Sequence, residues 1–209
     1  VFFPAFPAGP IDRIGRFIED LRKKTSQLSV DLPTASYRLL MGLFKKFALA
    51  DSLALIAINP DNAAQLNHPV WAWLMVYAYA FQLYWDFSGY TDIALGIAQI
   101  MGIRLPENFN RPYLRSNLTL FWNNWHITLT QWFRSYFYFP VTRYLRRNYR
   151  KMPAWIVILI TQIGTMVVIG LWHGITFNFV IWGLWHGLGL FVQNRYSYWA
   201  KPLDRWLES

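Results

Sequence analysis

The longest uncharged run in this chain covers residues 152–194, where 43 consecutive positions carry no Asp, Glu, Lys or Arg. A helix that crosses the hydrocarbon core of a bilayer needs about 20 apolar residues, so the run is long enough for two such helices. We predict membrane-spanning helices at residues 154–171 and 177–194, with a break at residues 173–176. This single feature restricts the chain to folds that suit a membrane.

The composition agrees with a lipid environment. Hydrophobic residues make up 55% of the chain and charged residues 15%, whereas soluble domains carry about 25% charged residues. The chain contains no Cys, which excludes disulfides, zinc thiolate sites and a Cys nucleophile. It opens with Val-Phe-Phe-Pro rather than with Met and a basic segment, so we expect a piece of a longer protein.

Shorter apolar stretches predict the remaining helices. Residues 70–85 are uncharged and have aromatic side chains at both ends, which predicts a third span. Residues 93–103 are too short to cross a bilayer and follow Ser88-Gly89, so we expect a turn and then a short, re-entrant or buried helix. Residues 34–58 contain four charges within an apolar stretch, which is costly in lipid unless these side chains snorkel or face protein, so we expect a tilted or packed helix. An interfacial helix is expected after the turn at residues 9–13.

The basic residues are concentrated in one segment. The net charge is +9, and residues 111–151 contribute +8 of it because they include eight basic residues and no acidic one. Five of these cations follow each other closely at residues 143–151, which we interpret as a cytoplasmic loop before the next span. This loop would contact anionic lipids or dock an acidic carrier protein or a phosphorylated donor. Nucleic acid is not expected as a partner, because the long apolar runs do not suit a soluble DNA-binding protein.

Three of the four histidines occur in apolar or aromatic surroundings. His173 ends the first span of the long run between two glycines, where an ionisable group is costly and is by default a candidate for function. Helix packing is the alternative for His173 and the preferred interpretation for His186, which is preceded by Gly183 and followed by Gly187. His68, next to Pro69, is expected to be a solvated loop residue.

His126 lies in an aromatic segment, residues 121–134. If the segment is one continuous helix, Trp122, His126, Leu129 and Phe133 share a face. Asn123 then places a second polar group beside His126, and a buried polar pair must find partners.

Several aromatic and polar motifs are distributed along the chain. They are Gly9-Pro10-Ile11-Asp12-Arg13, Trp85-Asp86-Phe87-Ser88-Gly89-Tyr90, Phe109-Asn110-Arg111-Pro112-Tyr113, Phe121-Trp122-Asn123-Asn124-Trp125-His126, Trp132-Phe133-Arg134, Leu171-Trp172-His173-Gly174 and Trp185-His186-Gly187. These motifs, and their order, resemble those of membrane-bound O-acyltransferases, the MBOAT family, in its bacterial branch of teichoic acid D-alanyl transferases and alginate O-acetyltransferases. The similarity extends over nearly all 209 residues.

The resemblance implies an all-α, multi-pass transmembrane bundle with short re-entrant or interfacial helices, forming one acyltransferase core over residues 1–209 in the bacterial inner membrane. It implies transfer of an acyl group from a cytoplasmic thioester donor, an acyl carrier protein or acyl-CoA, to a hydroxyl of a cell-envelope or extracellular polysaccharide. His173 corresponds to the characteristic histidine of the family and is expected to be the general base. His126 is expected to be the second catalytic residue. Substrate contacts are expected from Asn123, Trp122, Trp172 and Arg134.

No metal is expected, because the histidines and carboxylates lack a ligand spacing such as His-Glu-x-x-His, and no tightly bound cofactor is needed. Two other functions stay open. A transporter or flippase also places His and Arg in a membrane cavity, although internal repeats are absent from the sequence. A non-catalytic subunit of an envelope-polymer export complex would keep the basic segment without the histidine motifs.

Overall fold

The computed structural model describes residues 5, 8–12, 14–22, 31–64 and 68–207. All regular secondary structure in these ranges is helical, which confirms the predicted all-α class. The chain divides into two compact units, Val1–Asn108 and Phe109–Ser209. Arg13, Lys23 and Lys24, which the sequence placed in and after the first turn, lie outside the described residues.

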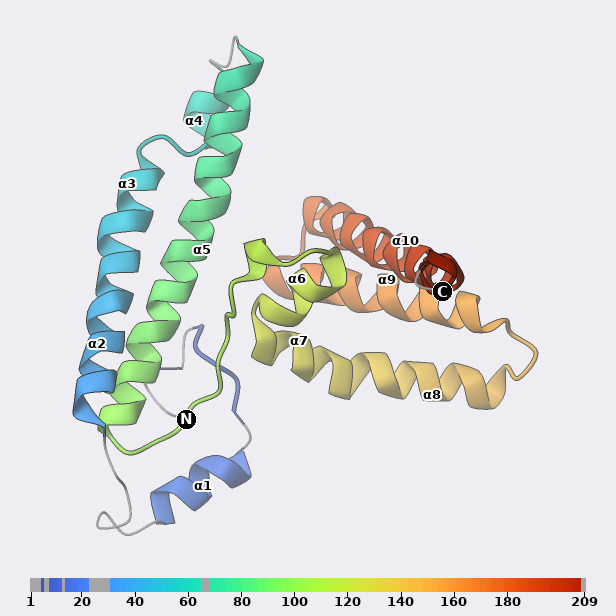
Figure 1. Ribbon diagram of the computed structural model, residues 1–209, viewed down its shortest axis with the longest axis horizontal. Coiled ribbons are helices and arrows are strands. Elements are labelled where there is room, and N and C mark those ends of the chain that lie inside the picture. The colour runs from blue at the N-terminus through green and yellow to red at the C-terminus, as the bar shows by residue number, and fades with distance from the viewer. Residues whose placement is uncertain (1–4, 6–7, 13, 23–30, 65–67, 208–209) are drawn as a thin grey trace. The chain divides into compact units, whose positions relative to one another are not determined.

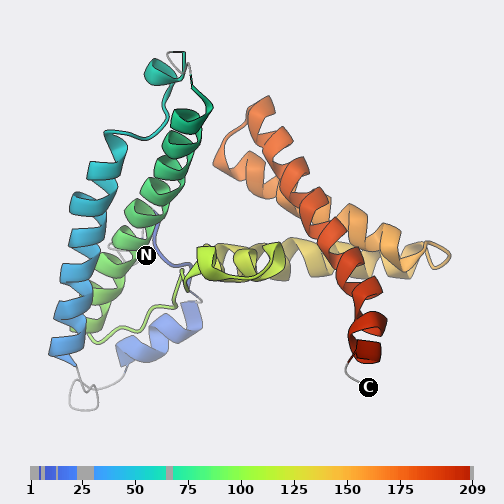
Figure 2. The same ribbon diagram turned by 45° about the horizontal axis from the view of Figure 1, so that its top comes forward.

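The first unit is built around one long helix, α5, which extends over Pro69–Ile100. A second rod lies beside it in both views (Figures 1 and 2) and is formed by α2 (Leu32–Leu43), the π-helix η3 (Phe44–Ala50) and α3 (Asp51–Ala54). The short helices α1 (Ile14–Arg22) and α4 (Pro60–Ala63) complete the unit. Side chains of Asp31, Asn59 and His68 accept hydrogen bonds from the first backbone amides of α2, α4 and α5, so each helix begins at a capping residue.

Glycines allow the two rods of this unit to approach closely. A Cβ atom built on Gly42 would lie 2.7 Å from the carbonyl oxygen of Gly89, and one built on Gly96 would lie 3.0 Å from the carbonyl oxygen of Ala35. Backbone therefore packs on backbone at these positions. The contact explains why α5 continues through Ser88 and Gly89, both buried, and why the predicted turn and separate short helix at residues 93–103 are wrong.

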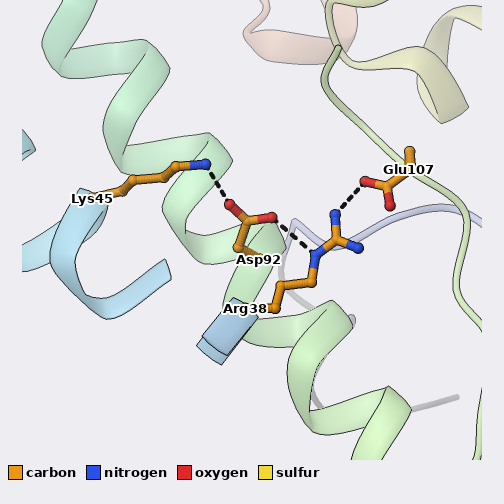
Figure 3. Close-up of polar contacts among 4 residues, drawn as sticks. All are labelled: Arg38, Lys45, Asp92 and Glu107. Carbon is orange, nitrogen blue, oxygen red and sulfur yellow. Dashed lines mark hydrogen bonds and ion pairs between the residues drawn. The ribbon is translucent and has the colours of Figure 1, made fainter. Parts of the chain in front are cut away.

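Ion pairs join the same two rods. Asp92 of α5 accepts hydrogen bonds from Arg38 Nε at 3.1 Å and from Lys45 Nζ at 2.5 Å (Figure 3). Arg38 also donates from Nη2 to Glu107 at 2.5 Å, and Lys46 pairs with Asp86. The expected packed helix is found over most of residues 34–58: Arg38, Lys45 and Lys46 pair with acidic residues, whereas Asp51, the fourth charge of the stretch, is exposed.

The second unit contains a helical hairpin and an angled rod. The rod consists of α6 (Leu118–Asn124), α7 (Ile127–Phe133), the π-helix η5 (Arg134–Tyr138) and α8 (Phe139–Asn148), preceded by the 3₁₀ turn η4 (Pro112–Leu114). The hairpin consists of α9 (Ala154–His173) and α10 (Phe177–Leu207) (Figure 2). Its core joins both parts and contains Trp122, Leu129, Phe133, Met166 and Ile169.

The break between α9 and α10 falls where the sequence predicted it, after His173. Helices α9 and α10 pack closely and antiparallel. A Cβ atom built on Gly183 would lie 2.6 Å from the Met166 carbonyl oxygen, and one built on Gly187, later in α10, would lie 2.7 Å from Ile163 Cα, earlier in α9. The predicted role of Gly183 and Gly187 in helix packing is confirmed. Side chains larger than hydrogen at these positions would separate the hairpin.

Among the described helices, α9 has both the length and the apolar composition of a membrane-crossing helix. The stretches predicted as the other two spans, residues 70–85 and 177–194, are helical and lie within α5 and α10. Of the basic segment at residues 143–151, which the sequence predicted as a loop, Arg143, Arg146 and Arg147 lie on α8, whereas Arg150 and Lys151 lie in the turn that follows it. Arg146 and Arg147 lie in the last turn of α8, where the helix dipole favours positive charge, so these two cations stabilise the helical conformation.

Candidate active site

His126 lies at a sharp corner between α6 and α7. Its backbone adopts the left-handed conformation, with φ 43° and ψ 55°, after Trp125 in an extended conformation. The segment is therefore not one continuous helix, and the shared face that Trp122, His126, Leu129 and Phe133 would have on such a helix does not form. A left-handed conformation is unfavourable for any residue other than glycine, so packing around His126 must hold it in place.

An aromatic cluster supplies part of that packing. The Trp125 ring lies 5.6 Å from the Phe121 ring, 5.8 Å from the Tyr113 ring and 5.2 Å from the Phe109 ring, between centroids. The backbone amide of Asn110 donates to the carbonyl oxygen of Asn124 at 3.1 Å. The motif at residues 109–113 thus folds back onto the end of α6, immediately before the corner.

The fold brings His126 near the end of α9. The His126 ring lies 6.3 Å from the Trp172 ring, and the Trp172 ring lies 4.8 Å from the His173 ring. His173 also contacts Phe179 and Trp182 of α10, with ring centroids at 6.0 Å and 5.9 Å. Two imidazoles that are distant in the sequence therefore share one aromatic environment in the second unit.

The two histidines differ in accessibility. His126 is 5% exposed, whereas His173 is an exposed residue rather than the buried one that the sequence suggested. His173 is the last residue of α9 and is followed by Gly174. Burial, and to a smaller extent the electrostatic influence of His173, lowers the pKa of His126 from 6.5 to about 4. His126 is thus a neutral imidazole at pH 7.

The remaining histidines have structural positions. His186 packs between Trp122 and Trp182, with centroid distances of 5.2 Å and 4.6 Å, in agreement with the predicted packing role. His68 is exposed as predicted, and its Nδ1 also accepts a hydrogen bond from the Val70 amide at the start of α5.

Three of the four residues expected to contact substrate line one cavity of about 120 Å³ in the second unit: Trp122, Asn123 and Arg134. Arg134 Nη1 donates to Asn123 Oδ1 at 3.0 Å, so Asn123 pairs with Arg134. Trp172, the fourth, lies with the histidines and is 56% exposed. Trp122 lines the cavity, and its ring lies 5.7 Å from the Trp182 ring, which in turn lies 5.9 Å from the His173 ring.

Sequence reasoning missed Gln162, whose side chain lines the same cavity from α9. The available signal was its position, since a side-chain amide within an apolar span usually hydrogen bonds to another group. It also missed the pairing of Asp92 with Arg38 and Lys45, although the cluster of cations in residues 34–58 indicated that acidic partners were needed.

Comparison with known proteins identifies relatives of this chain. Residues 1–207 match the family model described as MBOAT, membrane-bound O-acyltransferase family. The chain is 36% identical over 193 residues to the probable alginate O-acetylase AlgI of Pseudomonas putida, covering 91% of this chain and 38% of that protein. It is 38% identical over 203 residues to the peptidoglycan O-acetyltransferase of Helicobacter pylori, covering 94% of this chain and 36% of that protein.

A third relative is the teichoic acid D-alanyltransferase of Bacillus subtilis, 33% identical over 218 residues, which covers 99% of this chain and 54% of that protein. The chain thus spans between 36% and 54% of the length of these three relatives. Because the family model extends over almost all of its residues, the chain belongs to the membrane-bound O-acyltransferase family.

Proposed function

We propose that this protein is a multi-pass enzyme of the bacterial inner membrane that transfers an acyl group from a thioester donor to a hydroxyl of a cell-envelope polysaccharide. The approach of His126 and His173 around Trp172 carries this proposal. The three relatives support the class of reaction, because their names describe O-acetyl or D-alanyl transfer to alginate, peptidoglycan or teichoic acid.

His173 is the general base in this proposal. Its exposed ring takes the proton of the acceptor hydroxyl while the hydroxyl oxygen attacks the thioester carbonyl carbon. The carbon–oxygen bond forms, the carbon–sulfur bond breaks, and the proton passes from His173 to the departing thiolate. The products are an ester and a thiol, and no oxidant, reductant or cofactor is consumed.

His126 stabilises the negative charge that develops on the carbonyl oxygen. A neutral imidazole offers one N–H group, and burial at 5% exposure keeps water from competing for it. The strained backbone at φ 43° is consistent with such a role, because unusual conformations concentrate where a side chain must be held in one orientation. Trp172, between the two imidazoles, forms the wall against which the acyl group packs.

The basic residues of α8 and the following turn lie on the cytoplasmic side in this proposal and attract an anionic donor. Arg143 and Arg147 occur one helical turn apart and line an open groove with Tyr144 and Asn148. Both donor classes, acyl carrier protein and acyl-CoA, are negatively charged, so opposite fields would speed their encounter.

The test is acyl transfer by the purified full-length protein with His173→Ala or His126→Ala. General-base catalysis contributes about 10² to 10⁴ in rate, so His173→Ala should lose at least about 100-fold in turnover while donor binding persists. His68→Asn is the matched control, since it keeps a capping side chain at an exposed histidine outside the site. Normal turnover by His173→Ala would refute this mechanism. Transport of polymer without any ester formation by the unmodified protein would favour the flippase alternative.

A further inference from the structure

Three aromatic side chains form a row along one face of α10, shortly after the turn that follows His173. Phe179, Trp182 and His186 occur at intervals of three and four residues, so they project from the same side of the helix. All three are partly buried, whereas Trp185, which directly precedes His186, is 76% exposed. This aromatic row therefore packs against protein.

The first two members of the aromatic row contact His173. The Phe179 ring is nearly parallel to the imidazole, at 21° and a centroid distance of 6.0 Å, and the Trp182 ring is nearly perpendicular to it, at 77° and 5.9 Å. Trp172 contacts the imidazole from α9, at 75° and 4.8 Å. Rings from two helices thus border the imidazole of His173, and this packing restricts the orientations that it can adopt.

Trp182 makes two further ring contacts. Its centroid lies 4.6 Å from that of His186, one turn later in α10, and 5.7 Å from that of Trp122, in α6. His186 and Trp122 also contact each other, at 5.2 Å and a nearly perpendicular 88°. Perpendicular packing is a favourable arrangement for aromatic rings, so His186 and Trp122 support the indole that borders His173.

Close backbone contacts fix the two helices that carry these rings. A Cβ atom built on Gly170, one turn before His173, would lie 2.3 Å from the carbonyl oxygen of Phe179. One built on Gly183, next to Trp182, would lie 2.6 Å from a backbone oxygen of α9. Helix α10 therefore cannot shift toward the end of α9 without displacing backbone, and the place from which Trp182 approaches His173 is set by the fold.

We propose that Trp182 is a positioning residue that orients the His173 imidazole toward the acceptor hydroxyl, and that His186 acts through Trp182 by supporting its indole. The inference rests on the proposed function, in which His173 is the general base. A base must be aligned with the proton that it removes, and a displacement of about 1 Å can cost about 100-fold in rate. Neither Trp182 nor His186 touches the reacting atoms.

The test is a double-mutant cycle in the purified full-length protein. Trp182→Leu removes the ring and should lower kcat about 10-fold to 100-fold at an unchanged donor KM, because the chemical step depends on the orientation of the base. In a protein that already carries His173→Ala, the same change should not lower the residual rate further, since Trp182 acts through His173. A purely structural role would reduce both rates by the same factor, and that result would overturn the proposal.

His186 provides a second comparison. His186→Phe keeps a ring against Trp182 and should retain most of kcat, whereas His186→Ala removes the support and should lower kcat by about threefold to tenfold. Trp185→Ala is the matched control, because this neighbouring ring is exposed and lies outside the aromatic row, and it should leave kcat unchanged. Equal losses in His186→Phe and His186→Ala would refute the supporting role of His186.

Trp182→Phe keeps a smaller ring and should lose less kcat than Trp182→Leu. It replaces the leucine variant in the cycle with His173→Ala if that variant does not fold. Unchanged kcat in a folded Trp182→Leu protein, or a raised donor KM at unchanged kcat, would overturn this inference and leave the proposed function intact. Normal turnover by His173→Ala alone would refute both, because the base that Trp182 orients would then not be needed.

Discussion

Arg134 and Asn123 form a hydrogen bond of 3.0 Å, from Nη1 to Oδ1, that connects η5 to α6 across the corner occupied by His126. Helix α7 lies between Asn123 and Arg134 in the sequence. The bond therefore links the residues just before and just after the segment that begins with the strained backbone of His126. Both side chains are exposed, so the bond contributes little to overall stability.

The first prediction concerns this bond. Arg134→Leu and Asn123→Ala should each lower kcat/KM for acyl transfer, and the double variant should be no worse than the more impaired single variant. A coupling of about 1 kcal/mol, or about fivefold in rate, is expected for one hydrogen bond to a charged group at an exposed site. A double-mutant cycle measures it, with Arg22→Leu as the control at an exposed arginine of α1. Additive effects would show that the two residues act independently.

The second prediction concerns the backbone of His126. Glycine adopts positive φ freely, whereas alanine there retains the strain, so His126→Gly should be about 1 kcal/mol more stable than His126→Ala. This order is the reverse of the usual preference for alanine in helices. Chemical denaturation of the purified full-length variants measures the difference, and both should lack acyl transfer. Greater stability of the alanine variant would contradict the left-handed corner.

The third prediction concerns pH. The pKa of His126 is about 4 in the folded protein against 6.5 in the unfolded chain, so the unfolded chain takes up the proton first as pH falls. The contribution of His126 is fully present above pH 6.5 and decreases between about pH 6.5 and 4, by at most about 1.4 kcal/mol per pH unit. His126→Gln should flatten the dependence of unfolding free energy on pH in this window. An unchanged slope would indicate that His126 is not buried in the native protein.

The fourth prediction compares two glycines of α10. Gly183→Ala places a methyl group 2.6 Å from the Met166 carbonyl oxygen, which is backbone and cannot move without displacing α9. Gly189→Ala meets only Leu118 Cδ2, at 2.8 Å, the end of a flexible side chain. The first change should cost about 1–3 kcal/mol and the second clearly less. Thermal unfolding of both variants tests this order, and equal losses would argue against the antiparallel packing of α9 and α10.

The fifth prediction concerns donor delivery. Replacing Arg146, Arg147 and Arg150 with Gln should raise the donor concentration needed for half-maximal rate and leave the saturated rate nearly unchanged. The Debye length falls from about 10 Å at 0.1 M salt to about 3 Å at 1 M, so the difference from the unmodified enzyme should disappear at high salt. Replacement of the same three residues with Lys is the control that keeps the charge. Unchanged donor dependence at low salt would mean that these cations serve only topology and lipid contact.

The sequence by itself determined the helical class and the break between α9 and α10, and it predicted the two candidate histidines, because each of these depends on local features. An apolar run of sufficient length must be helical in lipid, where every backbone group needs an internal partner. His173 and His126 could be recognised because ionisable groups are rare in such surroundings and their motifs resemble those of one family.

Only the tertiary structure decided the features that depend on contacts between distant segments. Ser88 and Gly89 are read locally as a turn, but packing against Gly42 keeps α5 continuous. The aromatic segment around His126 has helical periodicity throughout, yet the cluster formed by Phe109, Tyr113 and Trp125 accompanies a corner there. Gln162 joins Trp122 at one cavity only because α9 packs beside α6, and no local pattern encodes that pairing. Side-chain contacts across helices, rather than the preferences of single segments, therefore set the geometry of the site.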